Sequence, residues 1–416
     1  MSFDSLLGAF SAHLMSEQFY QTARDKTCPN AFSRTRKLPL HALVAMLLCG
    51  MKKSIQAELG EFFAHLQQQA QLVHHVSAQA FAKARANLAA TAIFDLNEWL
   101  MNAAEEAQFI QRWHGLRLVA VDASTIKFGI RASRVPNAAC ADQIAFGMYL
   151  PGTEMMLSAS LHSIHEGERQ MLFQNLDRLC ETDLLLLDRG YPCNWLVAVL
   201  NQRNIPFCMR VEKSGDNGFT CVRNFLRSGL AEQIVTLNAP KQADAEDYEC
   251  SGTQKVRLIR NVTNKGTVRV LMVNMLDSKR WPASLFGDLY HQRWRIEEAF
   301  KRLKHRLNLE HVSGLSQRAV MQDFAAKILC DNLHTLATTA AHEQAQLAPN
   351  VRINRAFVCT VFRPLMPAIL FGIEVAEHIQ SAFDLIARET SRRKQGISKP
   401  RKPGNKPHKF MSQKNS

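Results

Sequence analysis

The sequence lacks paired cysteines and long apolar runs. Its 10 cysteines are scattered, and none forms a Cys-x-x-Cys pair. This excludes a disulfide framework and a cysteine zinc site, and it indicates a reducing compartment. The longest apolar runs, LPLHALVAMLLCG and LMPAILFG, are too short to span a bilayer. The amino-terminal MSFDSLLGAF lacks the basic region of a signal peptide, so we expect a cytoplasmic protein without a membrane partner.

Acidic residues are also scarce. The chain has 51 Lys and Arg against 37 Asp and Glu, which gives a formal net charge of +14. Residues 391–416 hold 9 of the basic residues and no acidic one, so the rest of the chain carries +5. The balance indicates a polyanionic partner, with nucleic acid ahead of a membrane surface. The Pro-containing basic tail is expected to be disordered when free.

Residues 1–110 repeat apolar residues at helical spacing and predict a helical amino-terminal domain. One interpretation is a plain helical bundle. The other is a DNA-binding module, whose basic residues lie in a Pro-containing connector and in a later helix and contact phosphates. These residues are Arg34, Arg36, Lys37, Lys83 and Arg85.

The periodicity changes near residue 116, where short apolar runs rich in β-formers begin. LLLLD is typical of a strand buried on both faces, and further strands and helices alternate around it. The segments FTCVRNFL, EQIVTL, KVRLIRNV and TVRVLMVNML predict an all-β insertion. The predicted fold class is therefore α/β, a mixed sheet with helices, interrupted by that insertion. The expected units are the helical domain 1–110, a first core part 111–212, the insertion 213–282, a second core part 283–345, and a helical region with the tail, 346–416.

Two aspartates follow the buried runs directly: Asp122 ends LVAVD and Asp188 ends LLLLD. In open α/β sheets, ligands bind at the carboxyl ends of the strands, so both carboxylates are well placed for chemistry. Asp is also common wherever a strand enters a turn, which is the plain alternative for either one. Two such residues after strongly apolar runs favour a site.

The stretch DLYHQRWRIEEAFKRLKHRL, residues 288–307, predicts one amphipathic helix. At about 100° per residue, four polar side chains fall within an arc of roughly 60° beside its apolar stripe. They are Tyr290, Arg293, Glu297 and Lys304. Glu298 points away from the stripe, so Glu297 is the candidate ligand and Glu298 the solvated residue. A surface helix with Glu–Arg pairs is the alternative, but the alignment of four different functional groups argues against it.

These residues carry a resemblance to a known family. Tyr290-x2-Arg293-x3-Glu297-x6-Lys304 matches the Tyr-Arg-Glu-Lys signature of DDE transposases of the insertion-sequence-four family. VDAST and DRGYP resemble the two aspartate motifs of that family. The resemblance implies a ribonuclease H-like core in which Asp122, Asp188 and Glu297 are catalytic and bind two Mg²⁺ ions, with Mn²⁺ as a substitute. Asp188 and Glu297 are 109 residues apart, and this separation independently indicates a folded insertion, because long structureless loops are uncommon.

The resemblance also implies contacts with DNA. Tyr290, Arg293 and Lys304 are expected to bind phosphates of the element's ends, Arg by its bidentate fork and Lys as a point charge. Arg189, beside Asp188, either contacts DNA or fixes its turn. Because two ends must be paired, the family implies a homodimer on DNA, in a cytoplasmic, nucleoid-associated protein.

Two other groups of residues have plainer interpretations. Some members of the family stack a flipped base on an aromatic side chain, and Trp281 and Trp294 are candidates by position; packing in the core is favoured for each. His162, His165 and Glu166 lie on or after a predicted strand rather than on a helix. The logic of a helical zinc motif therefore does not apply to them.

The sequence thus predicts a transposase that cleaves the ends of an insertion sequence and joins the 3′ hydroxyl to target DNA. One alternative is a nuclease of the same fold without strand transfer. Another is a DNA-binding regulator derived from a transposase, which the presence of all three acidic residues disfavours.

Overall fold

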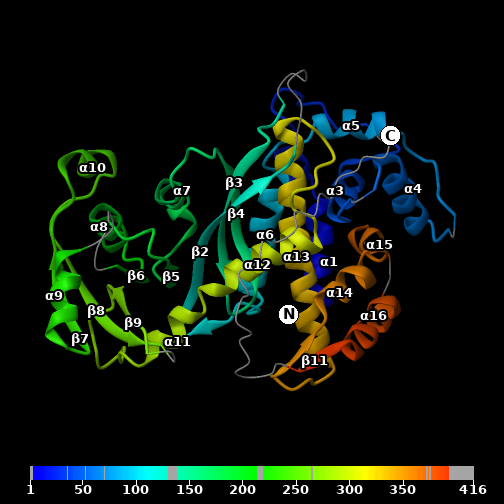
Figure 1. The fold of residues 1–416 in the computed structure, drawn as a ribbon. Helices are drawn as coiled ribbons and strands as arrows, with labels where there is room; N and C mark the ends of the chain where they lie inside the picture. The colour runs from blue at the N-terminus through cyan, green and yellow to red at the C-terminus, as the bar shows by residue number, and fades with distance from the viewer. Residues whose placement is uncertain are drawn as a thin grey trace.

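The computed structural model describes most of the chain (Figure 1). The described residues are 3–34, 36–51, 53–69, 71–129, 138–212, 219–263, 266–371, 373 and 376–392. The basic tail beyond residue 392 lies outside them, so its expected disorder stays a prediction. Within this described part of the chain, no helix is long and apolar enough to cross a bilayer.

Among the described residues, one mixed sheet of nine strands forms the centre of the molecule. The strands are β1 (Arg112–Trp113), β2 (Leu116–Lys127), β3 (Asp142–Leu150), β4 (Met155–His162), β5 (Asp183–Leu187), β6 (Phe207–Val211), β7 (Glu232–Leu237), β8 (Gln254–Val262) and β9 (Val268–Val273). Their order is β4-β3-β2-β5-β6-β9-β8-β7, and β1 pairs with β2. β2 is antiparallel to β3 but parallel to β5, which is parallel to β6. The expected mixed, ribonuclease H-like sheet is confirmed.

Helices cover both faces of the sheet because its central strands are apolar on both sides. Leu118, Ala120, Leu184 and Leu186 share a core with α11 (Leu285–His291), α12 (Trp294–Arg306) and α13 (Gln317–Gln344). The alternate residues Val119, Val121, Leu185 and Leu187 share the other core with α7 (Glu168–Gln174) and α8 (Asn194–Gln202). A short 3-10 turn, Leu176–Arg178, follows α7. Asp122 continues the series of even-numbered residues on β2 and therefore faces α12.

The amino- and carboxy-terminal helices pack together beside the sheet (Figure 1). The first group is α1 (Phe3–Leu14), α2 (Glu17–Ala23), α3 (Leu40–Leu48), α4 (Ile55–Leu66), α5 (Ala78–Ala86) and α6 (Ala92–Glu106). The second is β10 (Val351–Ile353), α14 (Arg355–Phe362), α15 (Met366–Leu370), α16 (Ala376–Arg388) and β11 (Thr390–Arg392). Ser11 Oγ donates a hydrogen bond of 3.2 Å to Leu370 O, and one hydrophobic core joins both groups. The domain boundaries expected from the sequence stay predictions.

The insertion is not all-β, which corrects the expectation from the sequence. The segment FTCVRNFL, expected to be a strand, forms most of α9 (Thr220–Ser228), and a second helix, α10 (Gln242–Asp247), follows β7. The apolar residues of α9 recur one turn apart, with Val222 and Phe225 buried on one side. The strands β7, β8 and β9 are as expected, but they extend the central sheet through β6.

Candidate active site

The register of the sheet brings the two predicted aspartates together. β2 and β5 run parallel, with Arg117 paired to Asp183 and Ala120 to Leu186. The same register continued by two residues sets Asp122 level with Asp188, on neighbouring strands. Asp188 Oδ1 accepts a hydrogen bond of 2.6 Å from the Gly190 backbone N–H, which fixes the carboxylate in the turn after β5.

The predicted helix over residues 288–307 is two helices, so the single-helix expectation was wrong. α11 ends at His291 and α12 begins at Trp294. Between them the backbone N–H groups of Gln292, Arg293 and Arg295 bond to carbonyls three residues earlier, as in a 3-10 turn. The apolar periodicity runs through this turn unchanged, which is why the sequence does not reveal it. Tyr290 therefore lies on α11, whereas Glu297 and Lys304 lie on α12.

Arg293 lies among the three predicted carboxylates. Its side chain is buried, and its Nη2 donates a hydrogen bond of 2.8 Å to Glu297 Oε1. Although burial lowers the pKa of this guanidinium, Tyr290 first and then Glu297, Asp122 and Asp188 raise it overall. Arg293 thus interacts electrostatically with all three, and Asp122, Asp188 and Glu297 form one cluster around it.

Asp122 is the most perturbed member of this cluster. Burial raises the pKa of its carboxyl to about 7. The positive charge of Arg293 acts in the opposite direction, and the negative charge of Glu297 adds to the rise. A carboxyl group with this pKa changes its charge near neutral pH, which is typical of functional sites.

The chemistry of this donor set suits a divalent metal ion. Hard cations such as Mg²⁺ prefer carboxylate oxygens, and these three side chains supply them. The side chains of Asp122, Asp188 and Glu297 are each partly accessible to solvent. In the conformation described, Arg293 supplies the positive charge next to Glu297, and no three His, Cys, Asp or Glu side chains of the described residues are close enough together to hold a metal.

The other predicted site residues lie at different positions around the cluster. Tyr290 is buried on α11, and this burial raises the pKa of its hydroxyl to about 12. The Lys304 ammonium donates a hydrogen bond of 2.6 Å to Thr125 O on β2, and burial lowers its pKa. Arg189 is exposed, with Nη1 3.7 Å from Glu212 Oε1. Tyr290 and Arg189 lie near Asp188, whereas Lys304 lies two turns along α12 from Glu297. The contacts of all three residues with DNA stay predictions.

Glu168 was missed by the sequence reasoning. It begins α7, and a Cβ added to Gly190 would lie 3.0 Å from Asp188 Oδ1 and 3.9 Å from Glu168 Oε2. The two carboxylates are therefore neighbours, and loss of hydration followed by the charge of Asp188 raises the pKa of Glu168. The only signal in the sequence was an acidic residue at the start of a short helix, which is usually explained by the helix dipole.

The two tryptophans have different environments. Trp281 is 8% exposed and stacks on Trp113, with ring centroids 5.6 Å apart, so the expectation of core packing is confirmed. Trp294 is 42% exposed, and the Arg293 guanidinium lies 5.4 Å from its ring centroid. The same expectation was wrong for Trp294, because it is the first residue of α12 and faces away from the apolar stripe.

The histidine cluster on β4 is held by local hydrogen bonds. His162 Nε2 is 2.7 Å from Ser160 Oγ, and His162 Nδ1 is 3.0 Å from Glu166 Oε2. His165 is exposed. These contacts satisfy the ring within the turn that follows β4.

The expectation that Arg85 of the amino-terminal domain binds phosphates was wrong. It is 5% exposed, its Nη2 lies 2.8 Å from Asp323 Oδ1, and its Nε donates to Gln322 Oε1 at 2.8 Å. Arg85 therefore joins α5 to α13. The other four basic residues expected to contact phosphates are exposed, and their role stays a prediction: Arg34, Arg36, Lys37 and Lys83.

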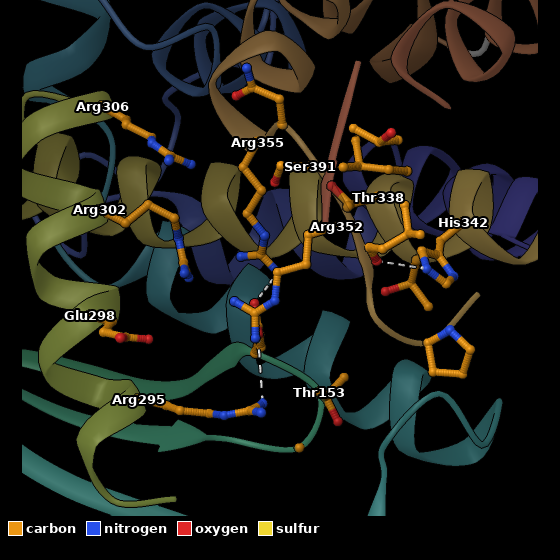
Figure 2. Close-up of a pocket in the computed structure, with 18 of the residues that line it drawn as sticks. Thr153, Arg295, Glu298, Arg302, Arg306, Thr338, His342, Arg352, Arg355 and Ser391 are labelled. Atoms are coloured by element: carbon orange, nitrogen blue, oxygen red, sulfur yellow. Dashed lines mark hydrogen bonds and ion pairs between the residues drawn. The ribbon is translucent and has the colours of Figure 1, made fainter. Parts of the chain in front are cut away.

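A cavity of about 980 Å³ lies on another side of α12 (Figure 2). Figure 2 shows Arg295, Arg302, Arg306, Arg352 and Arg355 around it. Much of this positive charge is compensated: Arg355 pairs with Glu154 at 2.7 Å, and Arg302 pairs with Asp331 at 2.7 Å. Glu298, Glu343 and Glu389 also line the cavity. The cavity holds none of the predicted site residues, and its four glutamates offset most of its six Lys and Arg residues.

Comparisons with known proteins show which proteins the chain is similar to. The family model described as "Transposase DDE domain" matches residues 113–333, which include all three carboxylates. The chain is 23% identical over 239 residues to "Transposase InsG for insertion sequence element IS4" of Escherichia coli (strain K12), covering 53% of this chain and 52% of that protein. The chain thus spans about half the length of this curated relative. A solved piggyBac transposase synaptic complex with hairpin DNA is similar with a TM-score of 0.45 and 10% identity, covering 94% of this chain and 87% of that one.

Proposed function

Because the chain belongs to the transposase DDE domain family, we propose that it cleaves the ends of an insertion sequence and joins the 3′ hydroxyl to target DNA. The observation that carries this proposal is the register of β2 and β5, which continued by two residues sets Asp122 level with Asp188. The hydrogen bond from Arg293 to Glu297 at the start of α12 supports it, because α12 packs on the face of the sheet toward which Asp122 points. Three acidic residues near one another on one face would suit phosphodiester chemistry.

Asp122, Asp188 and Glu297 would hold the divalent metal, two Mg²⁺ ions with Mn²⁺ as a substitute. When bound, such ions activate the attacking oxygen and neutralise the leaving one. The carboxylates must be ionised to bind, and Asp122 with its pKa of about 7 is then deprotonated. With Glu297 engaged by metal, Arg293 would be available to bind a phosphate of the DNA.

The partners follow from the same chemistry. Tyr290, Lys304 and Arg189 would contact phosphates on either side of the scissile bond. Pairing of two ends requires a homodimer on DNA. In the cell we propose association with the nucleoid, in the cytoplasm.

The test is cleavage of a labelled duplex that carries the element's own end, with Mg²⁺ or Mn²⁺. Wild type should cut at the end and, with target DNA added, form strand-transfer product. Glu297→Gln should bind DNA but not cut, whereas the matched control Glu298→Gln should cut normally, because Glu298 is exposed and lines the other cavity. Cutting without strand transfer would identify a nuclease, and binding without cutting by wild type would identify a regulator.

A further inference from the structure

A strongly basic hollow lies at the end of the insertion, where β6 ends and β9 begins. Its volume is about 560 Å³, and α9 lies along one side. Among the residues that the structure describes, five arginines line it against a single carboxylate, Glu212; they are Arg210, Arg223, Arg227, Arg260 and Arg269. We refer to these five residues as the arginine hollow. Its imbalance of charge contrasts with the larger cavity beside α12, where carboxylates offset most of the arginines.

The carboxylate in the arginine hollow does not neutralise it. Glu212 is shared between Arg210, at 2.7 Å, and Arg189, at 3.7 Å. Arg260 is engaged by the carbonyls of Phe225, Leu226 and Leu230 at the end of α9. Its guanidinium caps that helix and fixes one wall of the hollow.

Three arginines remain available for an external anion. Within the part of the chain that the structure describes, Arg223, Arg227 and Arg269 have no carboxylate at ion-pair distance; Arg223 Nη2 contacts only a hydroxyl, that of Thr220, at 3.4 Å. Arg223 and Arg227 are exposed one turn apart on α9, and Arg269 is partly exposed on β9. Like charges at this spacing repel one another, so an anionic ligand between them is stabilising.

The arginine hollow is continuous with the candidate active site. β5 and β6 are parallel, so the end of β6 lies at the same edge of the sheet as Asp188. Arg189, next to Asp188, reaches Glu212 at the rim. β9 and β8 follow β6 in the sheet. With strands about 4.8 Å apart, the basic edge extends roughly 15 Å from β5.

We propose that the arginine hollow binds the phosphate backbone of the DNA segment next to the scissile position. This inference rests on the proposed function. Phosphates of one strand are about 3.4 Å apart along a duplex, so a basic edge of roughly 15 Å corresponds to about four base pairs. The fork of each arginine suits phosphate oxygens and reads no base, so the surface sets the position of the duplex rather than its sequence.

The first test measures affinity for the end duplex in EDTA between 50 and 200 mM salt. The triple variant Arg223→Ala, Arg227→Ala, Arg269→Ala should bind at least tenfold more weakly, with a salt dependence reduced by about two to three units of slope. The matched control is Lys301→Ala, Arg306→Ala, Arg352→Ala, three exposed cations of the larger cavity beside α12. Its affinity and slope should equal those of wild type. The corresponding triple variant to Lys should retain the slope.

A second test trims the duplex one base pair at a time from either end. For wild type, affinity should fall when one side is shortened to less than about four base pairs from the scissile position, and the triple Ala variant should not show this loss. Equal slopes for the triple Ala variant and wild type would overturn the proposal, as would an equal loss in the control. If wild type binds the duplex through the arginine hollow but never cuts it with metal, the proposed function fails while the role of the arginine hollow is retained. If wild type cuts and the triple Ala variant binds normally, the proposed function is retained and the role of the arginine hollow fails.

Discussion

Arg293 Nη2 donates a hydrogen bond of 2.8 Å to Glu297 Oε1, one turn along the chain at the start of α12. The pair is not an ordinary surface contact, because the Arg293 side chain is 7% exposed. Its guanidinium also interacts electrostatically with Asp122 and Asp188. In the absence of metal it therefore offsets part of the repulsion within the carboxylate cluster.

Replacing Arg293 with Ala should separate DNA binding from metal binding. The substitution removes a positive charge from the cluster, so affinity for Mn²⁺ should be unchanged or up to about tenfold tighter. Affinity for the element's end should fall by at least tenfold, and Lys304→Ala should show the same loss without the gain in metal affinity. Calorimetry measures the affinity for Mn²⁺, and a mobility-shift assay measures the affinity for the end duplex. Equal losses in both assays would contradict this assignment.

Asp122 should make stability depend on pH. Between about pH 4 and 7 the unfolded chain ionises this carboxyl while the folded one, with a pKa of about 7, keeps its proton, so the contribution of Asp122 to stability falls as pH rises. Asp122→Asn does not titrate. In EDTA the free energy of unfolding of the variant should equal that of wild type at pH 4 and exceed it by about 2 kcal/mol at pH 8. This is roughly half of what the full pKa difference would give, because solvent reaches the side chain. Urea unfolding at both pH values measures the difference, and a less stable variant at pH 8 would refute it.

Gly147 should control the position of the glutamate helix. It lies opposite Asp122 on β3, and a Cβ there would be 2.9 Å from Phe300 Cζ on α12. Gly147→Ala should cost about 1–3 kcal/mol and reduce cleavage far more than DNA binding, because α12 carries Glu297. Phe300→Leu in the same chain should restore cleavage in part by making room. Full activity of the single variant would show that α12 tolerates the shift.

The two tryptophans should respond oppositely to truncation. Trp281→Ala should lower the free energy of unfolding by about 3–5 kcal/mol, since it removes a stacked, buried ring. Trp294→Ala should change it by no more than about 0.5 kcal/mol, because that ring is exposed. Both values come from urea denaturation. Comparable losses would mean that Trp294 is covered in solution.

The elements that the sequence predicted well are those with one dominant local signal. LLLLD predicted β5 because a continuous apolar run of that length suits a strand buried on both faces. Its neighbour LVAVD predicted β2. The hydrogen bond between Arg293 and Glu297 belongs to the alternative with Glu–Arg pairs, which the alignment of four functional groups had disfavoured. The local turn that separates α11 from α12 leaves no mark on the apolar periodicity, so the sequence could not reveal it.

The errors concern residues whose roles depend on distant partners. The sequence around Arg85 is typical of a surface cation. In the structure Arg85 is buried and forms an ion pair with Asp323, 238 residues later in the chain. Glu168 becomes part of the site only because α7 returns to the edge of the sheet beside Asp188. The first segment of the insertion was short enough for strand and helix patterns to be confused, and packing against β7 and β8 decided for the helix α9.

The packing of α1 against the last helices has a consequence for synthesis on the ribosome. The rings of Phe3 and Phe383 lie 5.6 Å apart, although they are separated by nearly the whole chain. At about 5 to 20 residues per second, roughly 20 to 75 s pass between their translation. During that time α1 can pack on α2 and α6, but the part of its apolar surface that contacts α15 and α16 has no native partner. The strands of the central sheet emerge meanwhile and can pair. The group of helices beside the sheet is therefore completed last. A nascent chain stalled before α16 would combine an assembled sheet with an exposed apolar surface on α1, to which chaperones can bind.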